Sequence, residues 1–259
     1  MNPNASTFDP AAAPAPRVAV WWAPLELAGP ALRTVTSCLS AEERRHASRL
    51  HRPRDRMRFE AARGWRRRLL ARQLGCAPAD VAIVTDDRGK PRVADRKLRF
   101  SAARSGAIAV YATSWDMDVG VDVEAIRPIG ELRGIAARFF TRAEQQDVES
   151  LPPAERLAAL FDCWTRKEAY VKGTGAGLTF PIDTADVWTD GSRDVRVSGW
   201  SIHRVDLTAG YAAAVAGAEA GGWLPSAPRR LKTPQHGDNS DDNADDGSAA
   251  DQRFGRAGA

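Results

Sequence analysis

Two short segments of the sequence carry the residue types that could bind a metal ion and a phosphate group. They are VGVDVE, Val119–Glu124, and WTRKEAYVK, Trp164–Lys172. In an extended chain, Asp122 and Glu124 would share one face, about 7 Å apart given a rise of about 3.4 Å per residue, and Gly120 would leave the approach to them open. Both carboxylates could reach one hard cation. A solvated acidic face on an edge strand is the alternative interpretation.

The second segment lies on a predicted helix. Its apolar residues recur at helical spacing and define a buried stripe that consists of Leu157, Leu160, Phe161, Trp164 and Val171. Glu168 follows Trp164 by four residues, so it lies near this stripe, where a carboxylate needs a partner. An ordinary surface pair with Lys172 would also explain it. Together, Asp122, Glu124 and Glu168 would supply three carboxylates, which suits Mg²⁺ or Mn²⁺ holding a polyphosphate, with basic side chains neutralising the remaining charge.

Helices and strands must position these segments. Capping boxes at Ser40 with Glu43 and at Thr141 with Glu144 predict two helix starts. A long helix is expected from about residue 55 to Leu74, ending at Gly75, and another from 154 to 172. The strands that we expect are 18–22, 81–85, a hairpin of 107–113 with 119–124 around the turn 114–118, and a hairpin of 200–206 with 211–216.

The two halves of the chain share a faint pattern. The capping boxes lie 101 residues apart (141 − 40), and Trp65 matches Trp164 at an offset of 99 (164 − 65). This pattern favours an α+β fold of two similar lobes, each with a long helix packed on a small antiparallel sheet. The predicted boundaries are a disordered N-terminus at 1–16, an N-terminal lobe at 17–118, a C-terminal lobe at 119–224 and a disordered acidic tail at 225–259.

Composition excludes several classes of protein. With 259 residues, of which 43% are hydrophobic and 27% charged, the chain can bury a substantial core. No apolar run approaches the roughly 20 residues of a membrane span, and the N-terminus lacks the features of a secretory signal. The three cysteines are scattered along the sequence, which is typical of reduced thiols, so we expect a cytoplasmic protein. We also expect a monomer.

Charge is distributed unevenly along the chain. The net charge of +4 (37 − 33) conceals a segment, Ser40–Arg72, with 12 arginines and four acidic residues, a local charge of +8 (12 − 4). The segment 237–259 has two arginines and six aspartates, a local charge of −4 (2 − 6). The basic segment should meet something anionic. A nucleic-acid-binding module is one alternative, but beyond Phe59 and Trp65 the segment lacks the interleaved aromatic residues of such a face.

In this order and about 40 residues apart, the two segments resemble the paired signature of the 4′-phosphopantetheinyl transferases, in their longer, two-lobed, single-chain (Sfp-type) class. The second signature, W-x-x-K-E-A-x-x-K, is matched in full. The resemblance extends over roughly residues 20–220 and implies a pseudo-twofold arrangement of the two lobes, with the active site between the lobes. It includes Leu39–Arg45, which resembles the family's LSxEE entry, Arg88–Val93, its Gly-Lys-Pro loop, and Phe139–Glu144, the link between the signatures.

The resemblance implies a Mg²⁺-dependent transfer of 4′-phosphopantetheine from coenzyme A to a serine of an acyl or peptidyl carrier protein, releasing adenosine 3′,5′-bisphosphate. Asp122, Glu124 and Glu168 would hold the metal, with Mn²⁺ as an alternative to Mg²⁺. Glu168, or a water on the metal, would accept the serine proton, and Lys172 would assist at the diphosphate. The residues implied at the coenzyme A site are Arg44, Lys90, Pro91, Arg104 and Lys167.

One departure from the family pattern affects the coenzyme A site. The family usually has a Ser-His pair that binds the 3′-phosphate of coenzyme A, and here Ala103 and Arg104 stand in its place. Arginine grips phosphate through a bidentate fork and stays charged, so we expect Arg104 to take this role. The alternative is a degenerate homologue that binds coenzyme A without turnover.

Overall fold

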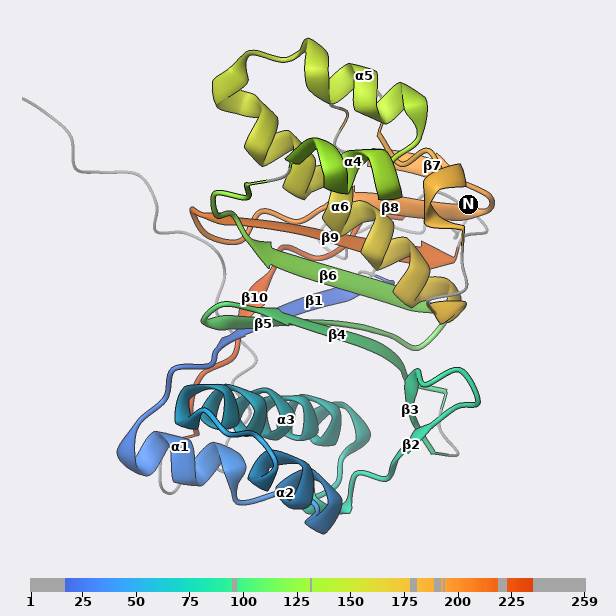
Figure 1. Cartoon of the computed structure of the whole chain (residues 1–259). Helices are drawn as coiled ribbons and strands as arrows, with labels where there is room; N and C mark the ends of the chain where they lie inside the picture. Colours follow the sequence, from blue (N-terminus) through green and yellow to red (C-terminus); the bar gives the residue numbers. More distant parts are fainter. Residues whose placement is uncertain are drawn as a thin grey trace, which may run out of the picture.

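The chain folds into four layers, helices–sheet–sheet–helices (Figure 1). The structure, a computed structural model, describes residues 17–94, 97–130, 132–177, 181–188, 192, 194–218 and 223–234. The two sheets face each other across a core of small and β-branched side chains, which include Val20, Val110, Val121 and Val215. The predicted α+β class, with long helices packed on small antiparallel sheets, is confirmed. None of the described helices is both long enough and apolar enough to cross a membrane.

The N-terminal lobe holds the first helical layer and the first sheet. Its helices are α1 (Gly29–Thr36), α2 (Ala41–Ser48) and α3 (Pro53–Leu74). Its strands are β1 (Ala19–Pro24), β2 (Ile83–Thr85), β3 (Pro91–Val93), β4 (Arg99–Ser105) and β5 (Ile108–Ser114). Strand β5 lies between β1 and β4 and pairs antiparallel with both, while β2 and β3 form a separate ribbon. Helix α3 covers the outer face of the sheet (Figure 1).

The C-terminal lobe holds the second sheet and the second helical layer. Its helices are α4 (Leu132–Phe139), α5 (Arg142–Ser150) and α6 (Pro153–Thr174). Its strands are β6 (Val119–Ala125), β7 (Asp194–Val197), β8 (Trp200–Arg204) and β9 (Tyr211–Ala218), and the sheet order is β6-β9-β8-β7. The predicted hairpin of residues 200–206 with 211–216 is present as β8 and β9. Helix α6 lies across β6 and β9 (Figure 1).

The two lobes repeat one topology. In each, the first strand pairs antiparallel with the second strand of a later hairpin, β1 with β5 and β6 with β9. Both predicted capping boxes form, at Ser40 and at Thr141. Both long helices have 22 residues and end at a left-handed glycine, Gly75 and Gly175, each with φ of 67°. Glycine adopts this conformation without the Cβ clash that other residues suffer, so it ends both helices at matching places.

The predicted hairpin of 107–113 with 119–124 is wrong. Both segments are strands, but β5 pairs with β1 and β4, whereas β6 pairs with β9 in the other sheet. The turn between them therefore carries the chain from one sheet to the next. The short polar turn favours pairing of β5 with β6. Instead, β5 pairs with β1 and β6 pairs with β9, which both lie far away in the sequence.

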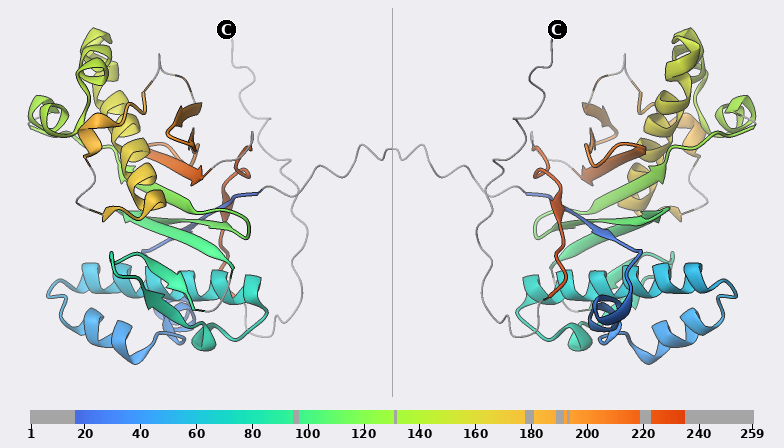
Figure 2. Two further views of the ribbon diagram at one scale, coloured as in Figure 1. Left: turned by 90° about the vertical axis from the view of Figure 1, so that its right-hand side faces the viewer. Right: turned by 90° about the vertical axis from the view of Figure 1, so that its left-hand side faces the viewer.

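The predicted start of the disordered tail, residue 225, is too early. Residues 223–234 cross from the C-terminal lobe to the N-terminal lobe (Figure 2), where β10 (Arg229–Arg230) pairs parallel with β1. Ser226 N donates to Val18 O at 3.0 Å, and Leu231 N donates to Trp22 O at 2.8 Å. The unpaired edge of β1 thus gives this polar segment backbone partners that its composition does not reveal. The predicted disordered N-terminus, 1–16, and residues 235–259 lie outside the described residues.

Candidate active site

The two signature segments meet where α6 packs on β6. Gly120 allows the contact, because a Cβ at this position would lie 1.9 Å from Ala169 O and 2.3 Å from Gly173 N. The absence of a side chain therefore brings the helix against the strand, rather than leaving an open approach for a ligand as the sequence suggests. This close packing places Glu168 and Lys172, one helical turn apart, beside the acidic residues of β6.

Asp122 is the most enclosed of the three predicted metal ligands. It is 4% exposed, its Oδ1 accepts a hydrogen bond from Lys172 Nζ at 2.5 Å, and its Oδ2 is buried without a hydrogen-bond partner. Burial raises the pKa of Asp122 to about 7, with further contributions from Glu124 and Glu168, and Lys172 opposes the rise. A buried carboxylate oxygen without a partner is costly, so this site is suited to a further cation.

Glu124 and Glu168 complete the acidic group. Glu124 is half-buried at the end of β6, where its Oε2 accepts a hydrogen bond from Ser105 Oγ at 2.7 Å. Glu168 is half-buried on α6, and burial raises its pKa, as does the charge of Glu124, while Lys172 lowers it. Since the charges of Glu124 and Glu168 both act on Asp122, the three predicted carboxylates lie in one electrostatic neighbourhood.

The chemistry of the donor set fits a hard divalent cation. Among the described residues, no group of three acidic, histidine or cysteine side chains is arranged so that it could hold a metal as it stands. The donors are carboxylate oxygens, which Mg²⁺ and Mn²⁺ prefer, and Asp122 Oδ2 is an oxygen with no other partner. In this structure the ammonium of Lys172 neutralises part of their charge.

Lys90 reaches this site from the N-terminal lobe. Asp86 holds the turn before β3 by accepting hydrogen bonds from Arg88 N at 3.0 Å and Lys90 N at 2.9 Å. The Lys90 ammonium donates to Gly173 O at 2.6 Å, near the end of α6, and to Val119 O at 3.3 Å. Burial lowers the pKa of Lys90 to about 8. Its cationic end lies beside the residue that follows Lys172, where it favours an anionic group.

The remaining predicted coenzyme A residues lie in separate places. Arg104 is exposed on β4, and its charge acts on Arg63 of α3. Arg44 lies on α2 and donates to Ser37 O at 2.9 Å. Pro91 begins β3 opposite Thr85 and lines a small hollow together with Lys90. Of this group, Lys90 hydrogen-bonds to both elements that carry the carboxylates, through Val119 O of β6 and Gly173 O of α6.

The prediction that Lys167 binds coenzyme A is wrong. Its side chain is 0% exposed, and its ammonium donates to Ile182 O at 2.8 Å, Ala185 O at 2.6 Å and Glu144 Oε2 at 2.8 Å. An ammonium has three donors, and all three have protein acceptors. Lys167 therefore ties α6 to the N-terminus of α5 and to the segment 182–185, and it has no donor left for a phosphate.

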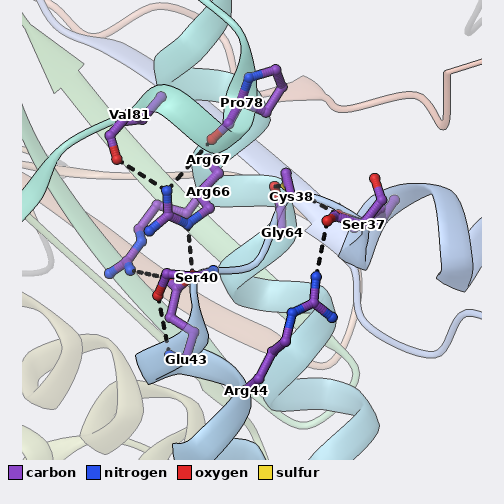
Figure 3. Close-up of polar contacts among 11 residues, drawn as sticks. Ser37, Cys38, Ser40, Glu43, Arg44, Gly64, Arg66, Arg67, Pro78 and Val81 are labelled. Carbon is purple, nitrogen blue, oxygen red and sulfur yellow. Dashed lines mark hydrogen bonds and ion pairs between the residues drawn. The ribbon is translucent and has the colours of Figure 1, made fainter.

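Some arginines of the basic segment form ion pairs within the N-terminal lobe. Arg66 and Arg67 are each 5% exposed and bind the two oxygens of Glu43, the capping residue of α2, at 2.8 and 2.6 Å (Figure 3). Arg54 and Arg58 both bind Glu26. Arg66 and Arg67 therefore hold α3 against the rest of the lobe. Seven other arginines of the segment are exposed: Arg44, Arg45, Arg49, Arg52, Arg54, Arg56 and Arg72.

A cavity of about 740 Å³ lies elsewhere on the C-terminal lobe. It is bounded by the N-terminal half of α6 and the chain from Arg204 to Ala213, and its lining includes Ala154 and Ala158. None of the three carboxylates lines it. The acidic side chains therefore lie outside the cavity. We assign the candidate active site to Asp122, Glu124, Glu168 and Lys172, at the contact between β6 and α6.

The comparison with known proteins identifies the family of the chain. Residues 118–216, which contain β6 and α6, match the model of the 4′-phosphopantetheinyl transferase superfamily. The 4′-phosphopantetheinyl transferase HetI of Nostoc sp. is 34% identical over 216 residues, which cover 80% of this chain and 90% of the relative. The chain belongs to the 4′-phosphopantetheinyl transferases.

Other phosphopantetheinyl transferases match a shorter part of the chain. Sfp of Bacillus subtilis is 28% identical over 152 residues, covering 58% of this chain and 66% of Sfp. AcpT of Salmonella typhimurium is 36% identical over 119 residues, covering 46% of this chain and 60% of AcpT. The chain is therefore an enzyme of this family, as the two signatures predict.

Ser105 also belongs to this candidate site, although the sequence does not single it out. Its hydroxyl contacts Glu124 across the boundary between the lobes. No local pattern marks a serine for such a role, because the contact depends on how two strands from different sheets come together.

Proposed function

We propose that the enzyme transfers 4′-phosphopantetheine from coenzyme A to a serine hydroxyl of a carrier protein. The observation that carries the proposal is the contact of Asp122 on β6 with Lys172 on α6, next to Glu124 and Glu168. It joins the two signature segments into one group of three carboxylates and a lysine. Such a group suits a reaction in which catalysis consists mainly of positioning and of neutralising charge.

Asp122, Glu124 and Glu168 would hold a divalent cation, Mg²⁺ or Mn²⁺. When bound, the cation would supply positive charge to the diphosphate of coenzyme A. The half-buried side chain of Lys172 would then turn from Asp122 to a phosphate oxygen. Lys90 lies beside the same end of α6 and would add a second cationic group there.

The chemical step forms one P–O bond and breaks another. The carrier serine oxygen attacks the phosphorus nearer to pantetheine, and the bond from that phosphorus to the bridging oxygen breaks. Adenosine 3′,5′-bisphosphate then leaves with the electron pair. Glu168 is suited to accept the serine proton, because burial raises its pKa towards the range in which a carboxylate is an effective base.

The protein substrate would be an acyl or peptidyl carrier domain. The exposed arginines of α2 and α3 give this lobe a basic surface, which suits an acidic partner. Coenzyme A and carrier proteins are substrates of the cytoplasm, and we infer the same location for the enzyme. Its three cysteines are all free, in keeping with a reducing compartment.

Intact-mass spectrometry of the carrier tests the proposal. An apo carrier protein is incubated with the enzyme, coenzyme A and Mg²⁺, and a parallel sample contains a chelator. We expect a gain of one phosphopantetheine group that the chelator prevents. An unmodified carrier together with tight binding of coenzyme A would indicate a homologue without turnover. An unmodified carrier together with tight binding of nucleic acid would favour the basic binding module.

Arg104 provides a test of coenzyme A recognition. We expect Arg104→Ala to raise the KM for coenzyme A about tenfold or more, because it removes a charge-assisted contact to the 3′-phosphate. The KM for 3′-dephospho-coenzyme A should stay the same, since that substrate lacks the group. Steady-state kinetics with both substrates measures the difference. Equal losses for both would mean that Arg104 does not contact the 3′-phosphate.

A further inference from the structure

The boundary between the two sheets is closed by serine side chains. Within the described part of the chain, β6 pairs through its backbone with β9 alone, and β4 is the outer strand of the other sheet. Two hydroxyls of β4 accept hydrogen bonds from β6, Ser101 Oγ from Val121 N and Ser105 Oγ from Ala125 N, both at 3.0 Å. Each serine satisfies a backbone donor that would otherwise lack a partner at a strand edge.

Ser105 makes one contact more than Ser101 does. Its hydroxyl also donates to Glu124 Oε2 at 2.7 Å. A hydroxyl has a single proton, and in Ser105 that proton is directed to the carboxylate while an oxygen lone pair receives Ala125 N–H. Among the described residues, the recorded hydrogen bonds of Ser101 include no carboxylate. The two serines therefore share a structural role and differ in their contact with the acidic group.

We propose that Ser105 is a positioning residue that orients Glu124 for metal binding, so that the N-terminal lobe holds a metal ligand of the C-terminal lobe in place. This inference rests on the proposed function. Glutamate has several rotatable bonds, and ordering its side chain costs entropy that a ligand must otherwise overcome. The short hydrogen bond from Ser105 to Glu124 Oε2 orders this side chain before the metal binds, so that Oε1 can face the metal. Partners of this kind outside the ligand set tune metal affinity in proteins by about tenfold or more.

Binding of Mn²⁺ to the full chain, measured by electron paramagnetic resonance without coenzyme A, tests this role. We expect Ser105→Ala to weaken Mn²⁺ binding about tenfold. The matched control is Ser101→Ala, which loses the same kind of backbone contact and should change the affinity less than about twofold. Ser105→Thr retains a hydroxyl and should restore the affinity. Equal effects of the two alanine variants would overturn the proposal.

A double-mutant cycle shows whether Ser105 acts through Glu124. Glu124→Gln alone should weaken Mn²⁺ binding, and adding Ser105→Ala to it should have no further effect. If the loss caused by Ser105→Ala persists in the Glu124→Gln background, the serine does not act through this carboxylate and the proposal fails. Thermal melting of each variant identifies any general loss of folding.

The carrier assay separates this inference from the proposed function. Ser101→Ala should modify the carrier at close to the wild-type rate, whereas Ser105→Ala should need about tenfold more Mn²⁺ to reach half of its maximal rate. If the wild-type enzyme modifies the carrier but Glu124→Gln binds Mn²⁺ as tightly as the wild type does, the positioning role is overturned while the transferase function stands. Absence of transfer in the wild type would instead contradict the proposed function.

Discussion

Replacing Asp122 by asparagine is expected to abolish transfer and, at the same time, to stabilise the metal-free protein at pH 8. Transfer should fall at least about a thousandfold, because the substitution removes a charged ligand of the divalent cation that would neutralise the diphosphate. Stability should rise because the asparagine amide occupies the same volume without a buried charge. Few substitutions in a core stabilise a protein, so the combination is a distinctive result.

The pH dependence of this effect follows from the pKa of Asp122. Burial raises that pKa from 3.8 in the unfolded chain to about 7 in the folded protein. Since the folded state then binds the proton more tightly, the contribution of Asp122 to stability is greatest when the carboxyl is protonated, and it decreases from about pH 4 to about pH 7. A shift of about three units corresponds to about 4 kcal/mol.

Urea unfolding of wild type and Asp122→Asn in the presence of a chelator measures the difference. The variant should be more stable at pH 8, by a few kcal/mol at most. The advantage should shrink at pH 5, where the folded wild type already holds the proton. A variant that is less stable than wild type at pH 8 would show that the charged carboxylate is well accommodated, contrary to its burial and its unpartnered oxygen.

Removing the charge of Lys167 is expected to destabilise the fold strongly and to leave the active-site chemistry intact. In Lys167→Met, the carboxylate of Glu144 stays buried and keeps its hydrogen bonds from Thr141 N and Val187 N, but it has no counter-charge. Breaking one side of a buried ion pair typically costs about 3–5 kcal/mol. Urea unfolding at pH 7 measures the loss.

The double variant Glu144→Gln with Lys167→Met serves as the control. It removes both charges, so it should recover part of the stability that the single variant loses. Coenzyme A affinity, measured by calorimetry on the double variant, should match that of the wild type. A stable Lys167→Met protein that binds coenzyme A poorly would instead support the cofactor role that the family signature implies.

Local signals in the sequence predict the elements of this fold well. The capping boxes at Ser40 and Thr141 and the terminal glycines of α3 and α6 depend on neighbouring residues alone, and all of them appear in the structure. Strand pairing depends on partners that lie far away in the chain. For this reason the predicted hairpin of β5 with β6 is wrong, and the pairing of β10 with β1 has no counterpart in the prediction.

The candidate site shows the same division between local and distant information. The signature identifies Lys167 and Lys172 equally, but five residues of helix turn them about 140° apart at about 100° per residue. One ammonium therefore enters the core beside Glu144 and the other reaches Asp122. The need for a glycine at position 120 also cannot be predicted from neighbouring residues, because it arises only from the packing of α6 on β6. Ser105 contributes through a boundary between lobes that no motif encodes.

We propose that the carboxylates of β6 and α6 share one divalent cation at the diphosphate of coenzyme A. A crystal of the enzyme grown with coenzyme A and Mn²⁺, measured near the manganese absorption edge, tests it most directly. We predict one anomalous peak that contacts Asp122, Glu124, Glu168 and the diphosphate. A manganese peak elsewhere, or one with Glu168 outside its coordination sphere, would contradict the account.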